Sequence, residues 1–263
     1  MRLWRLLDVE THNAFMNMAI DEAILRERIE EKIPNTIRFY RWKPSAVSIG
    51  RFQKIEKEVY LENCEKLGVD VIRRISGGGT VYHSQKELTY SVIAKTDDFG
   101  TKNIETVYAK VYGGIAEALK ILGITSDFNE GNPKKCPNLT VKGKKISGSA
   151  QAHKSGVFLQ HGTLLLDVDL EEMFTLLRVP WAKSCIEVVK VAERKITSLE
   201  VELGRIPSVE EVGHSLTEGF KRAFNVEFAK SRLTSSEFKL AIELSTKKYS
   251  TDSWNSHGKK WMD

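Results

Sequence analysis

The sequence of 263 residues has few cysteines and no long apolar run, and these absences exclude several classes of protein. Its three cysteines are scattered and form no Cys-x-x-Cys pair, so we expect neither a disulfide framework nor a structural zinc site. Apolar stretches extend for only a few residues, far short of the roughly 18–20 that span a bilayer. The first residues become acidic and polar within about ten positions, unlike a secretory signal. We therefore expect a cytoplasmic protein that has no membrane partner.

A strong excess of one charge is also absent. Lysine and arginine total 40 against 35 aspartates and glutamates, which leaves a net charge of +5. Because the two signs are interleaved, this mild excess is typical of a solvated surface rather than of a nucleic-acid-binding protein. An acidic protein partner or a phosphate-bearing ligand is the alternative use of the excess. Hydrophobic residues make up 41% of the chain, enough for a sizeable buried core.

Apolar periodicity predicts short strands framed by helices. Helices are expected over 12–31, 60–67 and 104–122, and strands over 36–40, 46–49, 69–72, 87–94 and 157–168. From about residue 170 the pattern is helical, with two capping boxes, Ser208-x-x-Glu211 and Thr234-x-x-Glu237. An antiparallel-looking strand cluster between helices indicates an α+β fold. We expect one domain over 1–255 and a flexible tail over 256–263.

Two glycines mark expected irregularities in the strands. Lys142-Gly143 is typical of a hairpin turn. Gly162 interrupts the strand expected over 157–168, which indicates either a bulge or a close approach of another backbone.

A run of three glycines follows the strand expected over 69–72. In RRISGGG (residues 73–79), missing Cβ atoms let backbone amides approach a ligand or form an anion-binding nest, and two arginines add permanent charge. A tight turn with two surface arginines is the alternative. The segment is not a P-loop, because no Gly-Lys-Ser/Thr follows it.

Two further segments combine a basic side chain with small residues. Lys145, followed by ISGSA, is suited to place an ammonium group in a narrow cleft, where it would polarise a carbonyl or hold an anion. An exposed hairpin tip is the alternative. His161 precedes Gly162 and is either a pocket residue or a hydrogen-bonded structural histidine. The six histidines show no metal-ligand spacing, so no metal site is expected.

Cys136 lies in a loop rich in glycine and proline, directly after Lys134 and Lys135. Two lysines beside a thiol favour the thiolate, which is the nucleophilic form. Cys64 and Cys185 fall in expected helices and are interpreted as structural. Cys136 is therefore the candidate nucleophile, with an ordinary loop cysteine as the alternative.

These segments belong to a longer series of motifs in a fixed order. The series is NMAIDEA (17–23), RFYRWKP (38–44), GRFQ (50–53), RRISGGGTVYH (73–83), ELTYSV (87–92), GKKISGSAQ (143–151), LQHGTLLLD (159–167) and KKYSTDSWN (247–255). It resembles the biotin/lipoate protein ligase and octanoyltransferase family over nearly the whole chain. The resemblance implies a class II biotin/lipoate ligase-like fold, in which a mixed, largely antiparallel sheet flanked by helices encloses an acyl-binding tunnel. It also implies transfer of octanoyl or lipoyl groups to a lysine of a lipoyl domain of 2-oxoacid dehydrogenases or of the glycine cleavage H protein.

The same resemblance implies roles for individual residues. Lys145 matches the family's active-site lysine, which contacts the acyl carbonyl or acyl phosphate. Residues of three motifs match the pocket for the acyl group or adenylate: Arg73, Ser76, Gly77, Gly78, Gly79, His83, Ser147, Gly148, His161 and Gly162.

The motifs are divided between two branches of the family. An octanoyltransferase takes octanoyl from octanoyl-acyl carrier protein onto a cysteine and needs no cofactor. A lipoate–protein ligase needs ATP and Mg²⁺, forms lipoyl-adenylate and, at this length, would need an accessory subunit. The unbroken glycine run is ligase-like, whereas ELTY, LQHG and SAQ resemble transferases, and the ligases' HDLGNLNF, whose asparagine helps hold nucleotide and metal, is absent.

Cys136 falls in the loop that carries the transferases' nucleophile. Its distance of seven residues from Gly143 requires a deletion in that loop. We favour the transferase, with Cys136 as nucleophile, and keep the ligase as the alternative. A non-catalytic binder of lipoyl domains is the remaining hypothesis.

Overall fold

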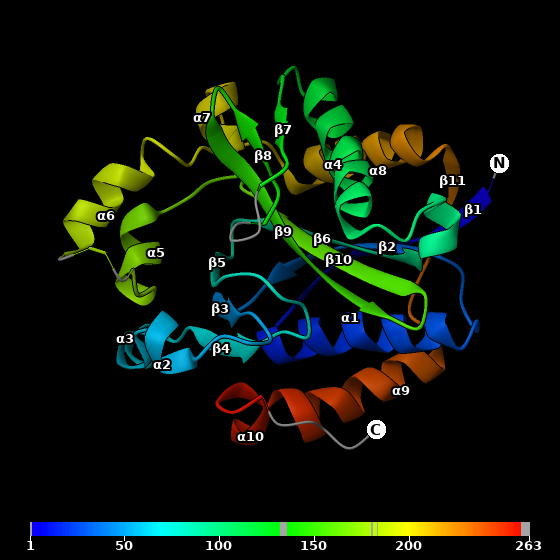
Figure 1. Cartoon of the computed structure of the whole chain (residues 1–263), viewed down its shortest axis with the longest axis horizontal. Helices are drawn as coiled ribbons and strands as arrows, with labels where there is room; N and C mark the ends of the chain where they lie inside the picture. The colour runs from blue at the N-terminus through cyan, green and yellow to red at the C-terminus, as the bar shows by residue number, and fades with distance from the viewer. Residues whose placement is uncertain (1, 132–135, 180, 183, 259–263) are drawn as a thin grey trace.

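The computed structural model describes residues 2–131, 136–179, 181–182 and 184–258. An eight-stranded mixed sheet forms its centre, in the order β11-β1-β2-β6-β10-β9-β8-β7 (Figure 1). Strand β1 pairs in parallel with β2 and β11, and every other neighbouring pair is antiparallel. The strands are β1 (Arg2–His12), β2 (Thr36–Trp42), β6 (Leu88–Lys95), β7 (Asp127–Asn129), β8 (Asn138–Val141), β9 (Lys144–Lys154), β10 (Val157–Leu164) and β11 (Val226–Ser231). This confirms the α+β fold with a largely antiparallel sheet.

A second, three-stranded sheet carries the glycine run. Its order is β4-β3-β5, with β3 parallel to β4 and antiparallel to β5. The strands are β3 (Ala46–Ile49), β4 (Asp70–Arg73) and β5 (Val81–His83). Residues 74–80, which we call the glycine loop, connect β4 to β5. Helices α2 (Ile55–Glu58) and α3 (Leu61–Leu67) precede β4 and contribute to the buried cluster beneath this sheet.

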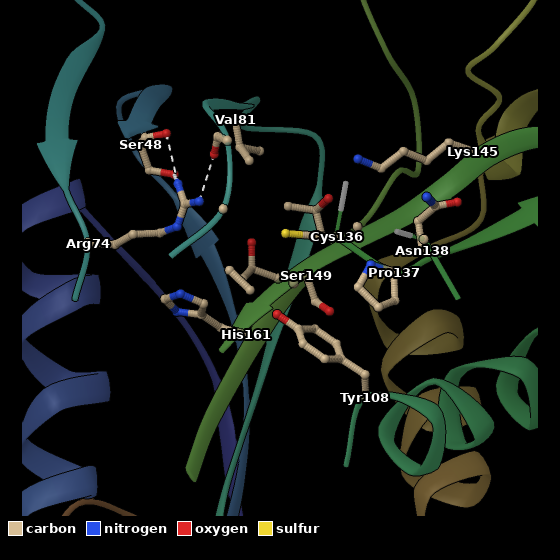
Figure 2. Close-up of a pocket in the computed structure, with 18 of the residues that line it drawn as sticks. Ser48, Arg74, Val81, Tyr108, Cys136, Pro137, Asn138, Lys145, Ser149 and His161 are labelled. Carbon is tan, nitrogen blue, oxygen red and sulfur yellow. Dashed lines mark hydrogen bonds between the residues drawn. The ribbon is translucent and has the colours of Figure 1, made fainter. Parts of the chain in front are cut away.

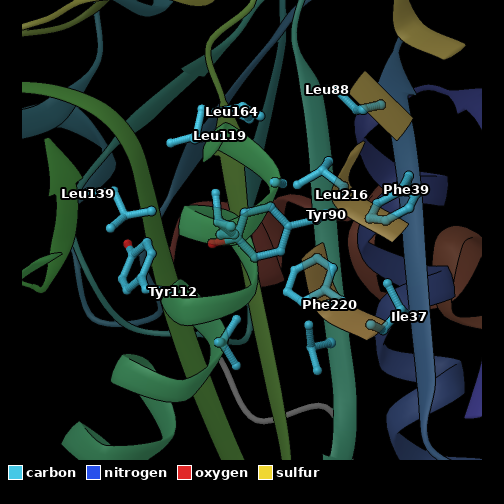
Figure 3. Close-up of a cluster of buried hydrophobic side chains, with 14 of the residues drawn as sticks. Ile37, Phe39, Leu88, Tyr90, Tyr112, Leu119, Leu139, Leu164, Leu216 and Phe220 are labelled. Atoms are coloured by element: carbon cyan, nitrogen blue, oxygen red, sulfur yellow. The ribbon is translucent and has the colours of Figure 1, made fainter. Parts of the chain in front are cut away.

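Helices cover both faces of the large sheet. Helices α1 (Ala14–Ile29) and α9 (Ser235–Leu244) pack against one face, and α4 (Ile104–Ile121) and α8 (Val209–Phe224) against the other (Figure 1). Helices α4 and α8 approach closely because Gly219 has no side chain: a Cβ there would lie 2.3 Å from the carbonyl oxygen of Gly114. The α4–α8 face carries an apolar cluster that includes Tyr90, Tyr112 and Phe220 (Figure 3).

Shorter elements complete the chain. They are the 3₁₀ helix η1 (Thr96–Phe99), α5 (Leu170–Leu176), α6 (Cys185–Ala192), α7 (Leu199–Leu203), the π-helical turn η2 (Ser245–Tyr249) and α10 (Asp252–Asn255). Among the described residues, no helix combines the length and apolarity needed to cross a bilayer.

The structure confirms part of the local prediction and corrects the rest. Lys142 and Gly143 both have positive φ, as expected for the hairpin turn. At Gly162 the register with both neighbouring strands is regular, so the bulge is wrong and the close approach is right: a Cβ would lie 2.5 Å from the carbonyl oxygen of Gly148. The box at Thr234 is complete. Ser208 caps α8, but Glu211 instead binds Arg205, which competes for its carboxylate.

Part of the segment expected to be a flexible tail is packed against the rest of the chain. Arg51 donates a hydrogen bond to the carbonyl oxygen of Gly258, and Arg73 donates one to that of Ser256. Residues 256–258 therefore pack on the small sheet, and the rest of the expected tail lies outside the described residues.

Candidate active site

A cavity of about 1160 Å³ lies between the glycine loop, α4, β9 and β10. Lys145 and Cys136 both line it, and Figure 2 shows the amino end of one and the sulfur of the other extending toward the glycine loop. Six of the pocket residues expected from the family resemblance also line it: Gly78, Gly79, His83, Gly148, His161 and Gly162. The site therefore brings together side chains from distant parts of the sequence.

A β-bulge places Lys145 at the cavity. Leu139 pairs with Ser147 and the next residue, Thr140, pairs with Lys145, so Ile146 is an extra residue in β9. Regular alternation would put Lys145 on the face opposite Gly148. Instead the two share a face, since a Cβ on Gly148 would lie 2.5 Å from Lys145 Nζ.

Both backbone polar groups of Lys145 are held by one segment. Its N–H donates to the carbonyl oxygen of Lys195 at 2.7 Å, and its carbonyl accepts from the N–H of Thr197 at 2.9 Å. The Nζ, by contrast, has no hydrogen-bond or ion-pair partner in the part of the chain that the structure describes. The arrangement fixes the base of the side chain and leaves its ammonium free for a ligand.

The surroundings of Lys145 also alter its acidity. Although Lys145 as a whole is exposed, the protein atoms of the cavity walls around its amino group lower its pKa below the ordinary value of 10.5. The charge of Cys136 opposes this lowering, and the charge of Arg74 adds to it. An ammonium with a lowered pKa gives up its proton more readily, which suits a group that both stabilises negative charge and transfers protons.

Cys136 lies two residues before β8 and is exposed to solvent. Its Sγ would be 3.5 Å from a Cβ built on Gly78, and Arg74 Nη2 would be 3.1 Å from the same point. The thiol and the guanidinium therefore converge on one glycine, whose φ of +83° also favours the absence of a side chain. Lys134 and Lys135 lie outside the described residues, so their effect on the thiol stays a prediction.

The structure distinguishes between the two adjacent arginines. Arg74 is buried and donates to Ser76 Oγ at 3.1 Å, to both oxygens of Ser48 at 3.0 and 3.2 Å, and to the carbonyls of Gly77 and Gly79 at 2.7 Å each. Burial lowers the pKa of Arg74 to about 10, so it is still a cation at neutral pH. Arg74 thus folds the glycine loop and supplies positive charge to the cavity, a role missing from the sequence prediction.

Arg73 turns away from the cavity, contrary to the expectation from the family resemblance. Its guanidinium donates only to backbone carbonyls, those of Gly50, Arg51, Gln53, Trp254, Asn255 and Ser256. Its role is to join the C-terminal motif to the segment after β3. The position of Arg73 at the end of β4 sets the direction of its side chain. The sequence of the arginine pair alone does not reveal which of the two side chains turns toward the cavity.

His161 lies within a buried hydrogen-bond network. Its Nδ1 is 3.0 Å from Asp21 Oδ2, and its Nε2 is 2.6 Å from Ser76 Oγ. Because a carboxylate only accepts hydrogen bonds, we assign the ring hydrogen to Nδ1, so Nε2 accepts from the serine. Burial lowers the pKa of His161, against the opposing effect of Asp21. Burial would raise the pKa of Asp21, but the hydrogen bond from His161 and the charge of Arg38 lower it overall.

His83 repeats this arrangement on the other side of Arg74. Its Nδ1 is 2.7 Å from Glu87 Oε1, its Nε2 is 2.8 Å from Ser48 Oγ, and the Trp42 ring stacks on it at 4.0 Å. The two serines that accept from Arg74 are therefore each bonded to a histidine that is bonded to a carboxylate. These chains connect the buried cation to two buried anions without placing either anion beside the cavity.

Three other expected pocket residues do not line the cavity. Ser76 and Gly77 lie behind it and hold Arg74, as described above. Ser147 is buried, and its hydroxyl has no hydrogen-bond partner among the described residues. The sequence does not predict the wall formed by α4, which includes Tyr108, because the apolar stripe of this helix is equally typical of a helix that only packs in the core.

No group of three or more His, Cys, Asp or Glu side chains forms a metal site in residues 2–131, 136–179, 181–182 and 184–258.

Comparison with known proteins agrees with this geometry. The profile of the lipoyl protein ligase A/B catalytic domain matches residues 13–221. Octanoyltransferase LipM of Brevibacillus brevis is 36% identical, covering 97% of this chain and 99% of its own. The structure of a bi-partite lipoate protein ligase and its E2 lipoyl domain from Thermoplasma acidophilum matches with a TM-score of 0.86 at 30% identity, over 100% of this chain and 99% of the other. Lipoate-protein ligase A bound with ATP matches with a TM-score of 0.83 at 31% identity, over 97% and 99% of the two chains.

The matched segment contains the glycine loop, Cys136, Lys145 and both cavity histidines. From its motifs, its fold and these matches, the chain belongs to the lipoyl protein ligase A/B catalytic domain family.

Proposed function

We propose that this chain is a cytoplasmic octanoyltransferase that carries octanoyl from octanoyl-acyl carrier protein, through a thioester on Cys136, to a lysine of a lipoyl domain or glycine cleavage H protein. The observation that carries the proposal is the convergence of the Cys136 thiol and the free Lys145 ammonium on one cavity beside the glycine loop. A full-length relative named octanoyltransferase LipM supports it.

In the first step, the Cys136 thiolate attacks the carbonyl carbon of the donor thioester. A new C–S bond forms and negative charge develops on the carbonyl oxygen. The Lys145 ammonium stabilises that charge, together with the N–H groups of Gly78 and Gly79, which donate no other hydrogen bond among the described residues. Collapse of the intermediate breaks the C–S bond to the donor, whose thiolate leaves and takes up a proton.

In the second step, the neutral amine of the acceptor lysine attacks the octanoyl-Cys136 carbonyl. The amide bond forms, the C–S bond to Cys136 breaks, and the amine proton passes to the departing sulfur, either directly or through Lys145, which gives its own proton to the sulfur and takes up the one from the amine. The lowered pKa of Lys145 lets it exchange this proton near neutral pH more readily than an ordinary lysine. The same residues thus serve both half-reactions.

The second candidate is an ATP-dependent lipoate–protein ligase. It is favoured by the unbroken glycine run and by the match to an ATP-bound ligase. In that reaction Arg74 and Lys145 would hold phosphate oxygens, Mg²⁺ would neutralise further charge, and an accessory subunit would be expected. The absence of the ligases' HDLGNLNF segment, whose asparagine helps hold nucleotide and metal, weighs against it.

Intact-mass spectrometry separates the two candidates. The protein is mixed with octanoyl-acyl carrier protein without ATP or acceptor, and the transferase predicts an added octanoyl group that is absent in Cys136→Ala. Cys185→Ala is the matched control, since this thiol lies outside the cavity, and it should acquire the group normally. No adduct, with transfer to a lipoyl domain only when ATP, Mg²⁺ and free lipoate are present, would establish the ligase.

A further inference from the structure

Few contacts hold the backbone around Cys136. Strand β8 begins at Asn138, so Cys136 lies outside the sheet ladder. Pro137 has no N–H group, and its carbonyl is the one backbone hydrogen-bonding group it can offer. That carbonyl accepts a hydrogen bond from the Tyr112 hydroxyl at 3.0 Å. Among the described residues, no other hydrogen bond reaches Cys136 or Pro137.

The Tyr112 hydroxyl is itself fixed by a chain of hydrogen bonds. Ser149 Oγ on β9 donates to it at 2.9 Å, and Gln160 Nε2 on β10 donates to Ser149 Oγ at 3.0 Å. Each hydroxyl therefore accepts from the sheet and donates onward. The chain of hydrogen bonds runs from the centre of the sheet to the carbonyl of Pro137, the residue that follows Cys136.

Packing fixes the other end of Tyr112. Its ring is fully buried in the cluster between α4 and the sheet, where it points its hydroxyl toward Leu139 of β8 (Figure 3). Burial raises its pKa well above 10, so the hydroxyl keeps its hydrogen and acts as a donor at all working pH values. A rigid ring with a protonated hydroxyl is a well-defined tether.

We propose that Tyr112 is a positioning residue, whose hydroxyl holds the carbonyl of Pro137, directly after Cys136, so that the thiol faces the acyl carbonyl between Gly78 and Lys145. This inference rests on the proposed role of Cys136 as nucleophile. Nucleophilic attack is sensitive to orientation, and a misplacement of about 1 Å can cost about 100-fold in rate. Tyr112 does not line the cavity, so it acts through Cys136 rather than on the substrate.

The test compares Tyr112→Phe with Tyr90→Phe. Tyr90 belongs to the same buried cluster, and its hydroxyl lies near Ser149 and Gln160 but makes no hydrogen bond to Cys136 or Pro137. Each variant removes one buried hydroxyl and keeps the ring, but only Tyr112→Phe cuts the tether. Thermal unfolding of both variants identifies any general loss of structure.

Two rates are then measured for Cys136 in each protein. The first is octanoyl transfer onto Cys136 from saturating octanoyl-acyl carrier protein, and the second is alkylation by iodoacetamide. Tyr112→Phe is expected to lower the maximal acylation rate about 10- to 100-fold at unchanged KM. Alkylation should stay within about twofold of wild type, because a small reagent needs no fixed approach. Tyr90→Phe should leave both rates within about twofold.

The outcomes are distinct. Equal acylation by wild type and Tyr112→Phe overturns the inference, as does an equal loss in Tyr90→Phe, which would indicate a general effect of the core. Absence of any octanoyl-Cys136 in the wild type removes the proposed function and with it this inference. Should Tyr112→Phe fail to fold, Ser149→Ala provides the second arm, with a smaller loss of acylation expected because it removes only the donor to Tyr112.

Discussion

The two walls of the cavity are built on opposite principles. The locked wall comprises Arg74 and the two serine–histidine pairs, all buried and bonded to one another through their side chains. The open wall comprises Cys136 and Lys145, whose reactive atoms have no hydrogen-bond partner among the described residues and whose positions are set through the backbone. Groups that must be oriented are locked, and groups that must react are kept free.

Electrostatics explain why the locked wall is elaborate. Arg74 pairs with no carboxylate in the described part of the chain, so its charge is not cancelled at the cavity. Asp21 and Glu87 lie one histidine and one serine away, which stabilises the buried cation from behind. A carboxylate placed directly on Arg74 would satisfy it as well but would repel the thiolate of Cys136 and the oxyanion.

The comparison is tested most strongly by Lys145→Ala. Loss of this ammonium should lower octanoyl transfer about 100- to 1000-fold. The free energy of unfolding should change by less than about 0.5 kcal/mol, because Nζ bonds to none of the described residues. A transfer assay and urea unfolding measure the two quantities. Lys144→Ala is the matched control, since its Nζ donates to the carbonyl of Glu193 outside the cavity, and it should retain transfer. Comparable rates for both variants would contradict the assignment.

Arg74→Gln, in contrast to Lys145→Ala, should lower the stability of the protein. The shorter, neutral side chain leaves the carbonyls of Gly77 and Gly79 without their donors, at about 1–3 kcal/mol each. We expect a loss of about 3 kcal/mol in the free energy of unfolding, measured with urea. Arg74→Lys keeps the charge but has fewer donors and should fall between wild type and Arg74→Gln. A loss below about 1 kcal/mol in Arg74→Gln would mean that the locked wall is not held by these bonds.

Gly162→Ala tests the packing of the sheet at Gly162 of β10, which lines the cavity between the two walls. An added Cβ would lie 2.5 Å from the Gly148 carbonyl oxygen and 2.6 Å from the Cβ of Ser149, and neither atom can move freely. Overpacking of this kind destabilises by about 1–3 kcal/mol. Urea unfolding measures it, and a variant as stable as wild type would show that β9 and β10 can separate locally.

Gly148→Ala is the same substitution with a different expected readout. The added Cβ meets only the end of Lys145, a flexible side chain that can swing aside. Stability should therefore change little, while transfer falls about 10-fold because the ammonium is displaced from the carbonyl. Transfer at the wild-type rate would show that Lys145 does not need its place over Gly148.

The two walls also differ in how far the sequence predicts them. Lys145, Cys136 and the glycine run are visible as motifs, because reactive residue types among small residues are unusual. Arg74 and its partners are not, since each bond joins segments far apart in the chain. The bulge at Ile146, which decides the face of Lys145, depends on the register with β8. Tyr112 follows the apolar stripe of α4, and periodicity cannot reveal that its hydroxyl has a separate role.

The fold shows the same limit. Strands rich in β-branched and aromatic residues, such as those over 36–40 and 87–94, are correctly expected, as is the turn at Gly143. Neither β1 nor β11 is evident, because their parallel pairing joins Arg2 to Val226 and no local pattern signals it. Likewise no sequence pattern predicts that the carboxylate of Glu211, in the capping box at Ser208, pairs with Arg205. Local sequence patterns predict the helices, strands and turns, whereas residues far apart in the chain decide how these elements pair and which partners their side chains bind.

The smallest expected effect concerns the pH dependence of the locked wall. Burial lowers the pKa of His161 in the folded state below its ordinary value of 6.5. Below about pH 6.5 the unfolded chain therefore binds a proton that the folded chain does not, and acid favours unfolding. One such group changes the free energy of unfolding by at most about 1.4 kcal/mol per pH unit.

Urea unfolding at pH 7.5, 6.5 and 5.5 tests this for wild type and His161→Gln. The variant should be less stable at pH 7.5, where it loses the bonds to Asp21 and Ser76, and should show a shallower decline toward acid. His153, whose pKa burial also lowers, contributes a decline of the same sign, and His153→Gln serves as the control outside the locked wall. An equal decline in His161→Gln and wild type would contradict the lowered pKa of His161. A steeper decline in His161→Gln would mean that His161 is already protonated in the folded protein. The hydrogen would then sit between Nε2 and Ser76, and the connection from Asp21 to Arg74 would be broken at its centre.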